Sequence, residues 1–272
     1  MRDDDCVRFL QWALPELRMR WPGFRKVRRQ VCKRIARRIA ALELAGLDAY
    51  RGRLADDPME WRVLDRLCRI TISRFWRDRA VFEALFDDVL PTLARSALEQ
   101  GDGTIRCWSC GCASGEEPYS LRIGWVATLA EKHPAISLEI LATDSDHAML
   151  ERARRAIYPA GSLKDLPGDL QSCAFEIDGD SRRLRDTFTR GVTWRCQDVR
   201  EQTPEDVFDL VLCRNLVFTY YEEALQLEII ERLAGSIPPG GALVVGSHEE
   251  LPQGQRCFEK WPPHPAIHRR RA

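Results

Sequence analysis

Three cysteines, two glycines and two glutamates lie within the thirteen residues CWSCGCASGEEPY at 107–119. Cysteines at this spacing could hold a zinc ion or form a redox-active dithiol. The glycines could instead form a tight turn that brings the backbone close to a ligand. A zinc site, a dithiol and a ligand-binding turn each require different neighbouring residues, so the surrounding sequence distinguishes the three.

The two cysteine-based interpretations find little support around the segment. Cys107 and Cys110 have zinc-knuckle spacing, but the chain has no second C-x-x-C and no histidine pair at zinc spacing. Cys107 also falls on a predicted strand, where successive side chains point to opposite faces. A thioredoxin-like dithiol needs its cysteines at the start of a helix, whereas here the glycines and Ser114 come between. We therefore predict no metal site and no dithiol chemistry.

A strand, a Gly-x-x-x-Gly turn and a helix that begins with acids predict the first crossover of a nucleotide-binding sheet. Gly111 and Gly115 allow a tight turn, but the segment matches neither G-x-G-x-x-G nor the Gly-Lys-Ser/Thr of a phosphate loop. The two glutamates would repel a phosphate, whereas they would attract a cation or accept hydrogen bonds from an ammonium group. A ligand with a sulfonium and an amino-acid end, S-adenosylmethionine, meets these demands.

Further acids lie where such a ligand would need them. Asp144 ends the next predicted strand, where an acid can accept hydrogen bonds from both ribose hydroxyls. It could instead cap the following helix, although Asp146 is better placed for that role. Asp198 could accept a hydrogen bond from an adenine amino group, or it could be an ordinary loop aspartate.

The elements that should position these residues alternate between strand and helix after residue 104. We expect strands at 105–108, 137–142, 207–213 and 242–246, and helices at 117–132, 147–156 and 222–235. This alternation predicts an α/β fold with a mainly parallel sheet covered on both faces. The stretch before it predicts helices at 24–44, 59–70 and 79–100. Gly46 would cap the first of these, and Asp57 with Pro58 would begin the second.

Composition narrows the class of protein. The 272 residues are 44% hydrophobic and 30% charged, and their formal net charge of +0 argues against general attraction to nucleic acid or membranes. We find no secretory signal and no apolar run long enough to span a bilayer. The ten cysteines are scattered through hydrophobic segments, which favours reduced, buried thiols over a disulfide framework. We therefore expect a cytoplasmic protein.

Four segments resemble, in order, the signatures of the chemotaxis-receptor methyltransferases (the CheR type). They are ITISRFWRD at 70–78, WSCGCASGEEPYSL at 108–121, LATDSDHAMLERARRAIY at 141–158 and CRNLVFTYY at 213–221. The resemblance implies an all-helical N-terminal domain at 1–66 and a Rossmann-like class I methyltransferase domain at 67–272. It also implies a small antiparallel insertion near 175–196 and methyl transfer from S-adenosylmethionine to receptor glutamates.

The resemblance also implies roles for individual residues. Those expected near the cofactor are Thr71, Ser73 and Arg77, with Glu117 at its methionine end, Asp144 at the ribose, Asp198 and Val199 at the adenine, and Arg214 and Asn215 closing the pocket. Arg77 is our candidate for orienting an acceptor carboxylate, because a guanidinium can bind both oxygens. It could instead form a surface ion pair with Asp78 or Glu83.

The chain departs from the family pattern at two places. The family's strand-end segment reads CRN-x-x-I-Y-F, with the tyrosine beside the methyl group, whereas here Thr219 takes that place and Tyr220 follows. Thr219 and Tyr220 are therefore both candidates for this catalytic contact. The closing segment, Gly-Ser-His-Glu at 246–249, is also altered.

These departures keep three functions open. The acceptor could be a receptor protein or a small di- or tricarboxylic acid, and the protein could instead be a non-catalytic sensor of the cofactor. The basic stretch 24–44 fits an ordinary solvated face, a contact for an acidic receptor region, or an attractor of a small polyanion. Nucleic-acid binding is a further option, which the neutral total charge and the lack of a nucleic-acid motif make the least favoured.

Overall fold

The computed structural model describes residues 2–272, which form two compact units. The first, helical unit comprises the chain up to Thr71 together with Thr219–Gln226. The second comprises Ile72–Phe218 and Leu227–Ala272. No sequence pattern indicated that 219–226 joins the helical unit. Within residues 2–272, every helix is too short or too polar to cross a lipid bilayer.

The helical unit is built from short helices. They are α1 (Asp3–Glu16), α2 (Trp21–Phe24), α3 (Arg28–Ala41), α4 (Leu47–Asp56) and α5 (Pro58–Cys68). Asp57 caps α5 as predicted, because its side chain accepts a hydrogen bond from the backbone N–H of Met59 at 2.9 Å.

Within the predicted helix at 24–44, the structure has α3 at Arg28–Ala41, while Phe24 is the last residue of α2; the expected role of Gly46 was wrong. Gly46 lies at the start of α4. The turn after α3 is made instead by Glu43, whose φ is 54°, and Leu44 N–H returns to the carbonyl of Ile39 at 3.1 Å. Glu43 thus takes the left-handed position that glycine usually occupies after a helix.

The apolar stripe of α3 forms part of the core of this unit, with Val31, Ile35 and Ile39 buried. Its basic residues do not all face solvent. Arg38 donates to the buried Glu60 at 2.6 Å, and Tyr50 donates to the same carboxylate at 2.8 Å. The ion pair with Arg38 holds the pKa of Glu60 below its usual value.

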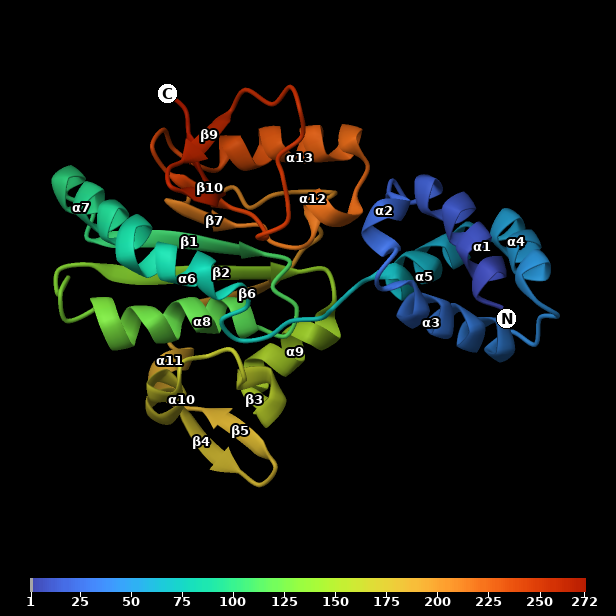
Figure 1. Cartoon of the computed structure of the whole chain (residues 1–272), viewed down its shortest axis with the longest axis horizontal. Helices are drawn as coiled ribbons and strands as arrows, with labels where there is room; N and C mark the ends of the chain where they lie inside the picture. The colour runs from blue at the N-terminus through green and yellow to red at the C-terminus, as the bar shows by residue number, and fades with distance from the viewer. Residues whose placement is uncertain (1) are drawn as a thin grey trace. The chain divides into compact units, whose positions relative to one another are not determined.

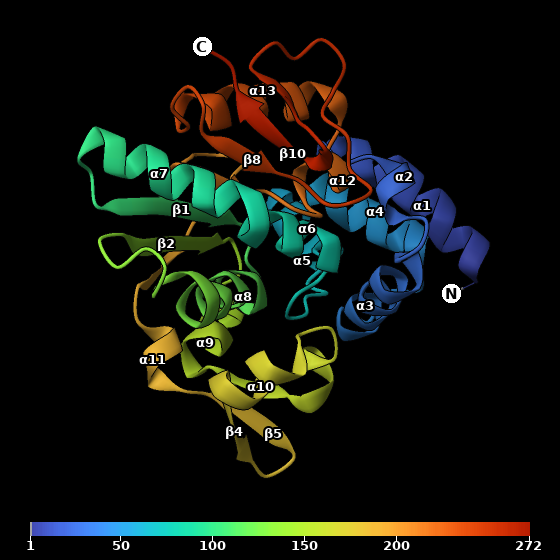
Figure 2. The same ribbon diagram turned by 60° about the vertical axis from the view of Figure 1, so that its left-hand side comes forward.

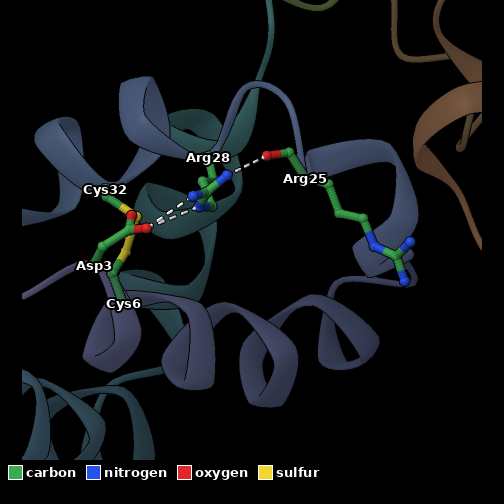
Figure 3. The surroundings of a disulfide bond; sticks show 5 residues. All are labelled: Asp3, Cys6, Arg25, Arg28 and Cys32. Carbon is green, nitrogen blue, oxygen red and sulfur yellow. Dashed lines mark hydrogen bonds and ion pairs between the residues drawn. A yellow bond between two sulfur atoms is a disulfide. The ribbon is translucent and has the colours of Figure 1, made fainter.

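A disulfide joins α1 to α3, which corrects the expectation that all the cysteines are reduced. Cys6 and Cys32 are bonded with their Cα atoms 6.0 Å apart, beside an ion pair in which Arg28 lies 2.8 Å from Asp3 (Figure 3). The pairing depends on which faces of two helices meet, and spacing along the chain carries no such information. The other eight cysteines are free thiols.

The second unit contains a seven-stranded sheet in the order β6-β2-β1-β7-β8-β10-β9 (Figure 1). The first five strands pair in parallel: β6 (Val192–Cys196), β2 (Ser137–Asp144), β1 (Thr104–Cys110), β7 (Leu210–Leu212) and β8 (Ala242–Val244). The antiparallel strands β9 (Phe258–Trp261) and β10 (His264–Arg270) complete the sheet. The predicted Rossmann-like α/β fold is confirmed.

Strands β9 and β10 were not predicted, because the sequence after residue 246 lacks an apolar run. Ala266 and Ile267 of β10 are buried, but Pro265 precedes them and His268, Arg269 and Arg270 follow. Arg270 is held at the sheet by carbonyl oxygens of Ala234 and Cys257 at 3.2 and 3.1 Å. A strand with few apolar residues is therefore placed inside the sheet between β8 and β9.

Helices flank the sheet much as predicted. The stretch 79–100 is continuously helical, as α6 (Arg79–Ala84), the π-helix η1 (Leu85–Val89) and α7 (Leu90–Gln100). The others are α8 (Glu116–Gly124), which continues into η2 (Trp125–Leu129), α9 (His147–Arg155), α12 (Val217–Tyr220) and α13 (Glu223–Gly235). Helix α7 packs along β1, while α8 and α9 pack against β2 and β6 (Figures 1 and 2).

The irregular region between α9 and β6 contains a small antiparallel sheet in the order β3-β5-β4. Its elements are β3 (Ile157–Pro159), η3 (Ala160–Leu163), α10 (Gly168–Ala174), β4 (Phe175–Asp178), β5 (Ser181–Leu184) and α11 (Asp186–Thr189). Strand β3 lies outside the range expected for an insertion, and β6 belongs to the main sheet. Figure 2 shows β4 and β5 as a hairpin standing away from that sheet.

Candidate active site

The strand order of the main sheet reverses between β1 and β7. Chain connections lead from β1 outward to β2 and β6, and from β7 outward to β8. Open α/β sheets bind ligands at such a switch point, outside the carboxyl ends of the strands. Here β1 ends at Cys110 and β7 at Leu212, so the turn 111–115 and residues 213–215 lie at that point.

Both glycines of the turn are required by backbone geometry and by packing. Gly111 has φ 74° and Gly115 has φ 90°, values that strain other residues. A Cβ atom on Gly111 would collide with the side chain of Leu216, and one on Gly115 would lie 2.8 Å from the ring of Trp194. The turn is fastened to β2, since Gly111 N–H donates to the carbonyl of Thr143 at 2.8 Å.

The cysteines around this turn are packing residues. Cys107, Cys110 and Cys112 are buried, and burial raises the pKa of the Cys107 and Cys112 thiols well above their usual value. A metal ligand or reactive dithiol needs the thiolate, which burial disfavours here. Over residues 2–272, no three His, Cys, Asp or Glu side chains are grouped so that they could hold a metal ion.

Arg214, which follows β7, links the two sides of the switch point. Its side chain is 2% exposed, and its guanidinium lies 3.0 Å from Glu117 and 2.9 Å from Asp78. The second oxygen of Glu117 accepts a hydrogen bond from Ser109 at 2.7 Å. Burial raises the pKa of Asp78, but the charges of Arg214 and Arg77 outweigh it and hold that pKa below its usual value. Two carboxylates therefore share one buried guanidinium.

Arg77 does not form the surface ion pair that the sequence left open. Its guanidinium donates to the side-chain oxygen of Asn215 at 3.0 Å and to the carbonyl of Ile72 at 2.9 Å. Glu83 pairs instead with Arg79, at 2.6 Å. The structure thus brings together Arg77 and Asn215, two of the residues expected beside the reacting centre.

Asn215 is itself fixed by the altered segment 246–249. It has φ 55°, and its backbone N–H donates to Glu249 Oε2 at 2.7 Å. The N–H of Gly246 donates to the same oxygen at 2.7 Å, and Glu249 is buried. A Cβ atom on Gly246 would lie 2.8 Å from that carboxylate. The segment therefore still supplies a glutamate and a glycine that support Asn215.

Asp144 lies at the carboxyl end of β2, beside the glycine turn. One carboxylate oxygen accepts from the N–H of Ala113 and the other from that of Asp146, both at 2.8 Å. Asp146 caps α9 as expected, since its side chain accepts from Ala148 N–H at 2.9 Å. The capping role is thus filled by Asp146, and Asp144 is oriented toward the turn.

The remaining predicted residues lie in several environments. Asp198 forms an ion pair with Arg200 at 2.7 Å, and Val199 beside it is buried. Thr71, Thr219 and Tyr220 belong to the helical unit, where the Tyr220 ring packs on Phe24 with centroids 5.1 Å apart. Their roles stay predictions.

Sequence reasoning did not place Asp78 in the site and did not distinguish Glu116 from Glu117. Glu116 is 3% exposed and accepts a hydrogen bond from Ser114 at 2.9 Å. Burial raises the pKa of Glu116, and this effect exceeds the opposite effect of the hydrogen bonds from Ser114 and Ser73. The adjacent glutamates of GEE gave no sign which one would point inward. Asp78 was considered only as a surface partner of Arg77, and its partner Arg214 is 136 residues away.

The acidic side chains of the site match the chemical groups of S-adenosylmethionine. The carboxylates of Asp78 and Glu117 at this point are hydrogen-bond acceptors, which suits a ligand with an ammonium group. Asp144, on the adjacent strand end, is the residue type that binds ribose hydroxyls in dinucleotide folds.

Comparisons with known proteins agree with this chemistry. A family model described as "CheR methyltransferase, SAM binding domain" matches residues 71–266, most of the chain. The chain is 33% identical over 185 residues to the chemotaxis protein methyltransferase of Listeria monocytogenes, covering 68% of this chain and 67% of the relative. It is 32% identical over 228 residues to a probable chemotaxis protein methyltransferase of Rhizobium etli, covering 81% and 84%.

Solved methyltransferases resemble the chain more distantly. The N-methyltransferase NodS from Bradyrhizobium japonicum matches 72% of this chain and 99% of its own, at 13% identity and a TM-score of 0.38.

Proposed function

Because the chain belongs to the CheR methyltransferase family and uses S-adenosylmethionine as its methyl donor, we propose that it methylates a carboxylate oxygen, that of a glutamate in a chemotaxis receptor. The observation that carries this proposal is the family match over 71–266, which includes the Arg214 cluster, that is, Arg214 and its partners Asp78 and Glu117. The names of the aligned relatives support a protein of the chemotaxis system as the acceptor.

The chemistry asks little of the protein in proton transfer. A glutamate side chain has a pKa near 4.3 and is ionised at neutral pH, so its oxygen attacks without a general base. Bound S-adenosylmethionine supplies a methyl group on positively charged sulfur. The new bond joins the carboxylate oxygen to the methyl carbon as the carbon–sulfur bond breaks, and its electron pair stays on sulfur. Alignment and exclusion of water therefore account for the rate.

In this proposal the residues of the site bind and align. Glu117, held by Arg214 and Ser109, accepts from the ammonium of the methionine end. Asp144 accepts from the ribose hydroxyls. Arg77 uses its guanidinium to orient the acceptor carboxylate, with Asn215 fixing its direction.

The test is methyl transfer to a receptor. The full chain is incubated with methyl-labelled S-adenosylmethionine and the cytoplasmic fragment of a chemotaxis receptor, and base-labile label on the receptor is measured. A fragment whose acceptor glutamates are replaced by alanine is the matched control. We expect label on the first fragment alone. Label on di- or tricarboxylic acids but not on receptor would contradict the protein acceptor, and cofactor binding without any transfer would identify a sensor.

A further inference from the structure

A cavity of about 700 Å³ lies against the C-terminal strands of the sheet. It is lined by the loop after β8, at 247–251, and by residues of β9 and β10. Its volume falls within the range of small-molecule sites. None of the residues that we assign to the methyl donor or acceptor lines it.

The cavity contains a buried nitrogen without a partner. His268 of β10 is 6% exposed, and its Nδ1 has no hydrogen-bond partner among residues 2–272. Burial, and then the charge of Lys260, lowers the pKa of His268 to about 4, so the ring is neutral at physiological pH. Buried polar atoms in proteins are normally satisfied, and an exception at a cavity wall suggests a ligand.

Lys260 stands beside this histidine. The two residues are a cross-strand pair between β9 and β10, so their side chains lie on the same face of the sheet. Within the described chain, the Lys260 ammonium has no ion-pair partner. An ammonium and a neutral imidazole side by side offer two donors to one carboxylate.

The rim carries the opposite charge. Glu259 is engaged by Arg271 at 3.7 Å, and Glu249 by the backbone N–H groups of Asn215 and Gly246. Glu250 is exposed, and its carboxylate has no partner among residues 2–272. A ligand with only negative charge would be repelled by these glutamates, and a ligand with only positive charge would be repelled by Lys260 and Arg271. The cavity therefore suits a ligand that carries both charges.

We propose that this cavity binds a small zwitterion of the α-amino-acid class, with its carboxylate on Lys260 and His268 and its ammonium on Glu250. The loop that forms one wall also supports the candidate active site. Glu249 of this loop holds Asn215, and the Ser247 N–H donates to Asp78. A bound amino acid would thus stabilise the loop that positions both residues.

Binding is tested by calorimetry on the full chain with a panel of L-amino acids. S-adenosylhomocysteine is present at saturation so that its amino-acid end fills the donor site. Without it, members of the panel could bind in that part of the donor site. Each amino acid is compared with the acid that lacks its ammonium and the amine that lacks its carboxylate. We expect at least one amino acid to bind about tenfold more tightly than both of its analogues.

Variants then locate the site. Lys260→Gln and Glu250→Gln should each weaken that binding about tenfold. Lys164→Gln and Glu205→Gln, at exposed residues outside the cavity, should leave it unchanged. Absence of binding by every amino acid up to about 10 mM, or equal binding by Lys260→Gln and the unaltered chain, would overturn the proposal. Both results are independent of methyl transfer, so failure here is distinguishable from failure of the proposed function.

Discussion

Arg214 and Glu117 form a buried ion pair, 3.0 Å long, between residues 97 positions apart in the chain. Arg214 follows β7 and Glu117 lies in the first turn of α8, which follows β1. The pair therefore bridges the two strand ends at which the sheet reverses its order. Asp78, on the other side of the guanidinium, ties the segment before α6 to the same point. One arginine thus holds three segments of the candidate site.

Replacing Arg214 by methionine should destabilise the second unit and weaken cofactor binding. The change leaves two partly buried carboxylates without their cation, which costs about 3–5 kcal/mol when a buried pair is broken. Urea unfolding and calorimetric titration with S-adenosylhomocysteine measure the two effects. Arg79→Met is the control, because the pair of Arg79 with Glu83 is exposed and is worth less than about 1 kcal/mol. Equal stability of both variants would contradict the importance of the Arg214 cluster.

The neighbouring aspartates Asp144 and Asp146 should differ in their effect on cofactor affinity. Asp144→Ala is expected to weaken cofactor binding by about 1–3 kcal/mol, because it strands the ribose hydroxyls. Asp146→Ala removes a helix cap and should cost about 1 kcal/mol of stability with little change in affinity. Titration and unfolding of both variants check this, and unchanged affinity in Asp144→Ala would remove Asp144 from the ribose role.

Arg77→Ala should abolish turnover while leaving most of the cofactor affinity. The guanidinium that would orient the acceptor is lost, and misplacement of a reacting group by about 1 Å can lower the rate about 100-fold. Methyl transfer and cofactor titration are measured in parallel. Arg74→Ala is the control, since Arg74 pairs with Asp165 and has no assigned role. Full turnover by Arg77→Ala would show that the acceptor is oriented by another group.

Local rules predicted much of this fold. Apolar runs placed β1, β2, β7 and β8, and the caps at Asp57 and Asp146 followed from residue type and position alone. The glycine turn and Asp144 also lie where the first two strands end. These features depend on residues close together in the chain, which is why the sequence indicated them.

Features that depend on distant residues were missed. β10 pairs with its neighbours β8 and β9 although its own sequence contains one proline, two histidines and two arginines. Asp78 is identified as part of the site only by Arg214, and Cys6 as a disulfide partner only by the packing of α1 on α3. Glu43 takes the left-handed position after α3 although glycine is the residue usually expected there.

The disulfide should stabilise the helical unit. Cys6 and Cys32 close a loop with a sequence separation of 26, for which the chain-entropy estimate is about 3–4 kcal/mol. The Cys6→Ser/Cys32→Ser variant should melt at a lower temperature than the unaltered chain, and a reductant should lower the melting temperature of the unaltered chain alone. Cys173→Ser, at an exposed free thiol, is the control. Alkylation of both cysteines without reductant, shown by mass spectrometry, would contradict the bond.

Glu60 and Glu116 should give opposite pH dependences of stability. The pKa of Glu60 is lowered by Arg38 in the folded state, so its contribution is present above its unfolded pKa of about 4.5 and is lost as pH falls. The pKa of Glu116 is raised by burial, so stability falls as pH rises from about 4.5 through its folded pKa. The Glu60→Gln substitution should therefore cost more stability near pH 7 than near pH 3. The stability of Glu116→Gln relative to the unaltered chain should increase as the pH rises from about 3 to about 7. Urea unfolding at a series of pH values measures both differences. Parallel curves for Glu116→Gln and the unaltered chain would show that the Glu116 carboxyl is not desolvated as its burial indicates.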